Sequence, residues 1–221
     1  MAESAKVLET EGLSAEHRTR LWQRRLFEGE AGLTRYLAAN GSAEDVAAWL
    51  RLRGEIFADL PGQSAPDPAG WQRVFFRAQA LMERFVVGRF GHDGLAGWTN
   101  AIAQVYRLVE PDFGGGAADP IRRFARQAEL YASEYAVTQA EPEQATIEIS
   151  HCAIWDYRER ARARGVVLTL KSPCEFCTLA TSANLEAKGY RSTFELLNHP
   201  SGPGCRWQAT KPSGQESSCA G

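Results

Sequence analysis

Apolar side chains recur every three or four positions through roughly the first 130 residues, and this spacing places them on one face of a helix. Gly29 and Gly32 interrupt the first of these segments. Ser42 with Asp45 resembles a capping box at the start of the second. The pattern predicts four or five helices, over about 14–27, 42–60, 71–86, 95–109 and from Asp119-Pro120 onward.

The apolar period changes to two after about residue 135. Segments 135–140 and 145–152 alternate β-branched and polar residues on either side of Glu141-Pro142-Glu143-Gln144, and they predict an antiparallel hairpin. A second strand pair is expected over 192–198 and 205–210.

Helical segments separate the two predicted hairpins. One is expected from Trp155 to Arg164, closed by Gly165, and another from about 174 to 188. The stretch 166–170 between them is either a short strand or a packed connection. We therefore expect an α+β fold, in which N-terminal helices are followed by a small antiparallel sheet of two hairpins with intervening helices.

Proline and glycine mark the candidate boundaries between parts of the chain. The stretch 61–70 is rich in both, and it separates an N-terminal helical segment (1–60) from a helical plus α+β domain (61–210). The same stretch could be a surface loop within one domain. Residues 211–221, which include Cys219, have the composition of a disordered tail.

Composition narrows the function classes. The 221 residues carry a formal net charge of −2, which argues against a nucleic-acid binder. Apolar residues make up 44% and charged residues 24%, as in folded soluble proteins. No run is long and apolar enough for a membrane span or a signal peptide, so we expect a cytoplasmic location and no membrane partner. The basic residues are mostly Arg, which is typical of a GC-rich bacterial source.

The most specific local feature is Cys174, in the sequence Ser172-Pro173-Cys174-Glu175. Serine at the N-cap, proline at the first helical position and glutamate at the third predict that a helix begins here. Backbone N–H groups and the helix dipole would then lower the pKa of the Cys174 thiol and make it a nucleophile. Cys177 lies one turn further on, and the alternative is that both are small half-buried side chains.

Zinc is the competing interpretation of these cysteines, because an apparently cytoplasmic chain favours free thiols or metal ligands over disulfides. A closed site of Cys and His ligands would need four residues from two or more elements. The candidate ligands are Cys174 and Cys177, together with either His199 and Cys205 or His151 and Cys152.

Histidine and arginine supply the remaining candidate chemistry. Neighbours in a strand point to opposite faces, so His151 is better placed to pair with Cys174 than with Cys152. The arginines at alternate positions over 158–164 predict a solvated helix face, and the alternative is that Arg158 binds a substrate carboxylate. Trp155 and Cys205 are further candidates for substrate binding.

The C-terminal part of the chain resembles the L-2-amino-thiazoline-4-carboxylic acid hydrolase-like family, which is related in shape to the 4-vinyl reductase small-molecule-binding domains. The resemblance rests on the spacing of His151-Cys152, Gly165, Cys174, Gly189, Phe194 and Gly204-Cys205-Arg206-Trp207.

This resemblance implies an α+β ligand-binding fold that opens a small sulfur-containing ring by hydrolysis, or binds a small molecule without turnover. Cys152, Cys174 and Cys205 fall where the family places its recurrent cysteines. Cys177 stands where family members tend to carry an acidic residue.

The residues and the resemblance lead to one functional hypothesis. We expect a bacterial enzyme that could serve specialised metabolite biosynthesis, in which Cys174 attacks an electrophilic carbon of a small polar or strained-ring substrate. His151 would shuttle the proton and Arg158 would hold a carboxylate. The hypothesis needs no cofactor, and no protein partner is indicated.

Two other classes of protein remain as alternatives. One is a sensor that binds a ligand without turnover, like the 4-vinyl reductase domains. The other is a zinc-bound structural protein that resembles phage minor head proteins, with Cys174, Cys177, His199 and Cys205 as ligands.

Overall fold

The computed structural model of the chain describes residues 12–62 and 64–212. These residues form seven helices and one four-stranded antiparallel sheet, which confirms the predicted α+β class. The helices are α1 (Ala15–Asn40), α2 (Ala43–Phe57), α3 (Pro68–Phe90), α4 (Asp93–Val109), α5 (Ala118–Tyr131), α6 (Ala153–Ala163) and α7 (Glu175–Ala187), and the strands are β1 (Glu134–Ala140), β2 (Gln144–His151), β3 (Arg191–His199) and β4 (Gly202–Thr210).

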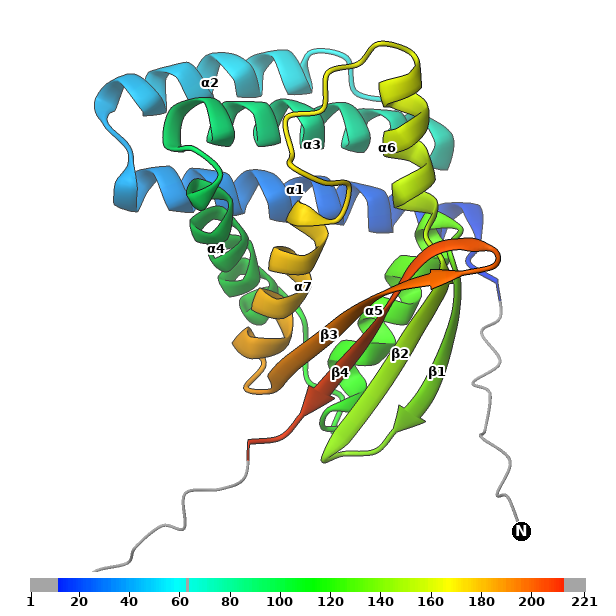
Figure 1. Cartoon of the computed structure of the whole chain (residues 1–221). Coiled ribbons are helices and arrows are strands. Elements are labelled where there is room, and N and C mark those ends of the chain that lie inside the picture. Colours follow the sequence, from blue (N-terminus) through cyan, green and yellow to red (C-terminus); the bar gives the residue numbers. More distant parts are fainter. Residues whose placement is uncertain (1–11, 63, 213–221) are drawn as a thin grey trace, which may run out of the picture.

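Helices α1 to α4 build a helical layer, with α1, α2 and α3 side by side at the top of Figure 1. Trp22, Trp49 and Trp98 are each almost completely buried in its core. Because residues of α1 and α2 share this core with α3 and α4, the core does not divide at residue 60. The predicted capping box forms at α2, where Ser42 and Asp45 exchange backbone-to-side-chain hydrogen bonds.

Helix α1 runs without a break through Gly29 and Gly32, where the sequence pattern predicts an interruption. The reason is a close helix crossing. A Cβ atom on Gly32 would lie 2.8 Å from Cα of Ile102 on α4, which is closer than real Cβ contacts allow. The glycine therefore lets two helices pack tightly and does not end the first one.

The two hairpins join into a single sheet with the strand order β1-β2-β4-β3. Ile147 of β2 and Phe194 of β3 both pair with Trp207 of β4. This face of the sheet is covered by α5, whose small side chains pack with Ile147 and Trp207 in a second core. The opposite face carries charge, because Arg206 forms ion pairs there with Glu148 (2.8 Å) and Glu195 (3.2 Å).

Helices α5 and α7 connect the helical layer to the sheet. On α7, Phe176 belongs to the helical core and Leu185 to the core under the sheet. On α5, Arg123 reaches a carboxylate oxygen of Glu28 on α1 at 2.6 Å and one of Glu110 at 3.4 Å. The two layers are thus held at a fixed separation, and the space between them contains the candidate site.

Three local expectations need correction or fall outside the structure. Helix α5 begins at Ala118, because the Asp119 carboxylate accepts hydrogen bonds from Phe113 and Gly115 in the preceding loop. Of the two alternatives for 166–170, the structure has the connection and not the short strand. Residues 213–221, which hold most of the predicted tail and Cys219, lie outside the described residues.

Within residues 12–62 and 64–212, no helix combines the length and the apolar character that crossing a lipid bilayer requires.

Candidate functional site

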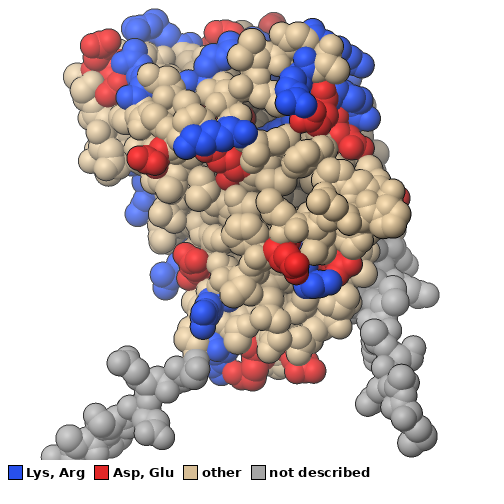
Figure 2. All heavy atoms as spheres, in the orientation of Figure 1, with Lys and Arg blue, Asp and Glu red and all other residues tan. Residues whose placement is uncertain are grey.

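A cavity of about 360 Å³ lies between the helical layer and the sheet. Its wall is mostly apolar and comes from both layers. Tyr157, Val166 and Leu196 belong to the wall and are still 40%, 47% and 53% exposed, so they mark its mouth. In Figure 2 the middle of the face shown is largely uncharged, and charged side chains gather over the helices at the top. The apolar wall residues include Phe75, Phe76, Phe124, Ile149, Ile154, Leu168, Phe176, Ala180 and Trp207.

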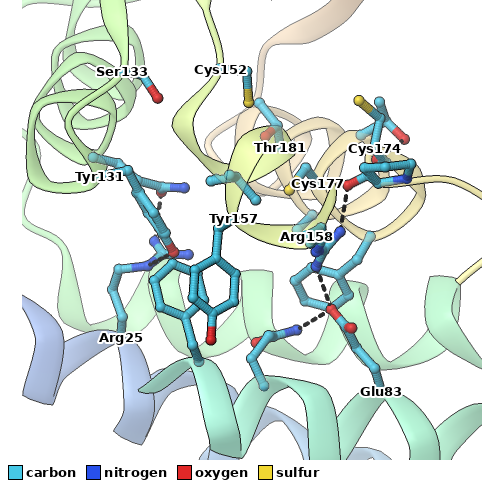
Figure 3. Close-up of a pocket in the computed structure, with 18 of the residues that line it drawn as sticks. Arg25, Glu83, Tyr131, Ser133, Cys152, Tyr157, Arg158, Cys174, Cys177 and Thr181 are labelled. Atoms are coloured by element: carbon cyan, nitrogen blue, oxygen red, sulfur yellow. Dashed lines mark hydrogen bonds and ion pairs between the residues drawn. The ribbon is translucent and has the colours of Figure 1, made fainter. Parts of the chain in front are cut away.

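All four cysteines of the described residues line this cavity. Cys152 follows β2, Cys174 precedes α7, Cys177 lies on α7 and Cys205 lies on β4. None of them forms a disulfide, and each is partly buried. The fold therefore brings together the cysteines that the sequence singles out, and Figure 3 shows three of them around the cavity.

Burial controls the acidity of three of these thiols. It raises the pKa of Cys174 and of Cys205 to about 12 in each case, and it raises the pKa of Cys177 as well. Neighbouring cysteines add to the effect, since two thiolates close together repel each other. The expected lowering of the Cys174 pKa is therefore wrong. At neutral pH the thiols of Cys174, Cys177 and Cys205 are protonated.

The start of α7 also differs from the prediction. The helix begins at Glu175 with Cys174 as its N-cap residue, two positions later than the predicted N-cap at Ser172. The Glu175 carboxylate accepts a hydrogen bond from the backbone of Lys171 (2.6 Å) and contacts the ring of His92 (2.8 Å), so the predicted capping box with Ser172 does not form. Removal of the thiol from water outweighs the favourable charge of Arg158.

Arg158 is buried in the cavity wall, which corrects the expectation of a solvated face at this position. It donates to the carboxylate of Glu83 at 2.6 Å and to the carbonyl of Pro173. Gln79 donates to the same carboxylate oxygen at 3.0 Å. Burial raises the pKa of Glu83, and the guanidinium opposes this rise. Arg158 thus ties α6 to α3 and to the start of α7, as the dashed lines in Figure 3 show.

His151 lies outside the cavity wall. Its Nε2 contacts the Asp156 carboxylate at 2.8 Å, and its Nδ1 contacts the carbonyl oxygen of Ser201 at 2.7 Å. These two acceptors favour the doubly protonated ring and raise the pKa of His151. The His151 ring joins the β3–β4 turn to α6, and the geometry does not bring it to Cys174 as a proton shuttle. Trp155 is likewise outside the wall.

The four candidate zinc ligands do not converge. Cys174, Cys177 and Cys205 line the cavity, whereas His199 does not. Side chains along β3 point alternately to the two faces of the sheet, so His199 lies on the face opposite to Leu196. Its ring lies 3.6 Å from Glu148 on the charged side of the sheet. Within the described ranges, no three His, Cys, Asp or Glu side chains are arranged to hold one metal ion.

Several polar residues of the wall have no role in the sequence-based account. Among them are Arg25 on α1, Glu83 on α3 and Tyr131 on α5. Glu83 and Gln79 lie one turn apart within the apolar stripe of α3, and a charged residue on a buried face is the signal that could have identified Glu83. Arg25 and Tyr131 carry no comparable local signal.

The fold and the cavity define an α+β protein with a chamber of small-molecule size between a helical layer and a half-covered sheet. Comparisons of the chain with protein-family models, with curated proteins and with solved structures found no match. Function is therefore inferred from the geometry of the cavity.

Proposed function

We propose that the protein binds a small, largely apolar molecule in the cavity between the helical layer and the sheet. The observation that carries this proposal is the cavity itself: about 360 Å³, open at Tyr157, Val166 and Leu196, with aromatic and aliphatic walls. Known small-molecule sites have this size range and this mixture of apolar wall with a few placed polar groups. A solid core would have gained packing energy from filling the same space.

Cysteine-dependent transformation of the bound molecule is the second candidate function. It is favoured by the position of Cys174 in the wall, next to the guanidinium of Arg158, whose charge lowers the thiol pKa against the effect of burial. Burial keeps the thiol neutral, so attack on an electrophilic carbon requires that the bound molecule itself or a neighbouring group accept the thiol proton. The proposed relation to the L-2-amino-thiazoline-4-carboxylic acid hydrolase-like family would make this a ring opening.

Calorimetric titration with diphenylamine, a neutral two-ring probe, tests the binding proposal. In the variant Ala180→Phe a larger side chain occupies the cavity from α7, and the same substitution at exposed Ala47 of α2 is the matched control. We expect binding to the wild type and to Ala47→Phe, and an affinity at least about tenfold lower in Ala180→Phe, since a filled pocket loses its contacts with the probe. Equal affinity in all three proteins would contradict the proposal.

A further inference from the structure

The cavity wall contains four charged side chains, and three of them are neutralised by partners. Arg158 pairs with Glu83 at 2.6 Å, and Arg77 pairs with Glu55 at 3.3 Å on the outside of the helical layer. Arg25 is different. Within the described parts of the chain, no carboxylate lies in ion-pair distance of its guanidinium, so it gives this part of the wall a net positive charge.

Neutral groups hold Arg25 in place. Its Nε donates to the hydroxyl oxygen of Tyr131 at 3.0 Å, and its Nη1 donates to the amide oxygen of Gln127 at 2.6 Å. Its guanidinium also lies 5.3 Å from the ring centre of Phe75 and 5.4 Å from that of Tyr131. The side chain is therefore fixed against α5 and α3 before any ligand arrives, which lowers the entropy cost of binding.

The free hydrogen-bonding groups of this cluster are mainly donors. Arg25 takes one acceptor site on each of the side-chain oxygens of Tyr131 and Gln127, and the free donors are the Tyr131 hydroxyl proton, the Gln127 amide N–H groups and the unused N–H groups of the guanidinium. Burial raises the pKa of Tyr131 to about 12, and the hydroxyl keeps its proton at neutral pH. A cluster that offers several donors and a positive charge matches an oxyanion, above all the planar carboxylate.

We infer that Arg25, Tyr131 and Gln127 form the oxyanion-recognition end of the cavity, and that the ligand is an organic acid with an apolar body. This inference rests on the proposed binding function and assigns the anchoring role to Arg25, not to Arg158, whose charge Glu83 already balances. Figure 3 shows Arg25 with Tyr131 on one side of the cavity and Arg158 with Cys174 on the other, with Tyr157 between them. The acid group binds at the first side, and the apolar body extends toward the thiols.

Two probes that differ by one carboxylate separate this inference from the proposed function. Diphenylamine reports binding to the apolar cavity, and 2-anilinobenzoate is the same framework with a carboxylate. Both are titrated calorimetrically into the wild type, Arg25→Gln, Tyr131→Phe and the control Arg77→Gln, whose side chain is also in the wall but is already paired. Circular dichroism confirms that each variant is folded.

We expect the wild type and Arg77→Gln to bind the carboxylate probe more tightly than diphenylamine. Arg25→Gln should lose about 10- to 100-fold in affinity for the carboxylate probe and keep its affinity for diphenylamine, because a charge-assisted hydrogen bond is lost. Tyr131→Phe keeps the aromatic ring but lacks the hydroxyl, and we expect a smaller loss of affinity for the same probe. If the wild type binds both probes equally, or if Arg25→Gln keeps the preference, the inference is overturned while the binding function stands. If neither probe binds the wild type, both fail.

Discussion

At the scale of single residues, burial decides the chemistry of the cysteines. A helix N-terminus stabilises a nearby anion by at most about 2 kcal/mol, which corresponds to roughly 1.5 pKa units. The pKa of Cys174 nonetheless rises from 9.0 to about 12, because the thiol is removed from water and lies close to Cys177 and Cys152. The sequence identifies Cys174 and the helix that begins beside it, but it does not reveal the burial that raises the pKa of the thiol.

The rate of alkylation by iodoacetamide tests whether the pKa values of the Cys174 and Cys205 thiols are raised. Only the thiolate reacts, so a raised pKa makes both thiols slow at neutral pH and makes their rates increase as pH rises. We expect both to react at least about tenfold more slowly than N-acetylcysteine at pH 8, with rates still rising at pH 10. Peptide mapping by mass spectrometry assigns each site, with Cys174→Ser as the control. A rate at Cys174 that levels off near pH 7 would show an activated nucleophile instead.

At the scale of elements, the sequence is a good guide wherever the signal is local. The alternation of strand residues predicts both hairpins, and Ser42 with Asp45 predicts the start of α2. The prediction fails where a distant contact decides the outcome. Gly32 has a low helix propensity, yet α1 continues through it because α4 packs against that position. Similarly, Glu175 bonds to Lys171 and His92, and the start of α7 shifts.

Alanine substitution at two helical glycines separates the effect of close helix packing from the effect of helix propensity. At Gly32 an added methyl group meets the backbone of Ile102, with 2.9 Å from the new Cβ to its nitrogen, whereas at Gly88 of α3 nothing lies within 4 Å. We expect Gly32→Ala to lower the free energy of unfolding by about 1–3 kcal/mol. Gly88→Ala should raise it by about 0.5–1 kcal/mol. Denaturant unfolding measures both, and a stabilised Gly32→Ala would refute the close crossing.

At the scale of the whole molecule, the candidate site belongs to no single element. Its wall combines α1, α3, α5, α6 and α7 with three strands, and its two ends come from Arg25 and Arg158, which are far apart in the sequence. The sequence predicts most of the elements but neither the strand order β1-β2-β4-β3 nor the face on which His199 lies. Those depend on how the hairpins pair and how α5 and α7 bridge the layers, and no local pattern encodes such contacts.

The central claim is that a small molecule occupies the cavity between the layers. The most direct measurement is a two-dimensional ¹H–¹⁵N NMR titration of the wild type with 2-anilinobenzoate, followed at the tryptophan indole N–H signals. Trp207 lines the cavity, whereas Trp49 lies in the helical core and its indole donates to Thr34 at 2.9 Å. Our account predicts a saturable shift of the Trp207 signal with the Trp49 signal unmoved. A shift at Trp49 with Trp207 unchanged, or no shift at either, would contradict it.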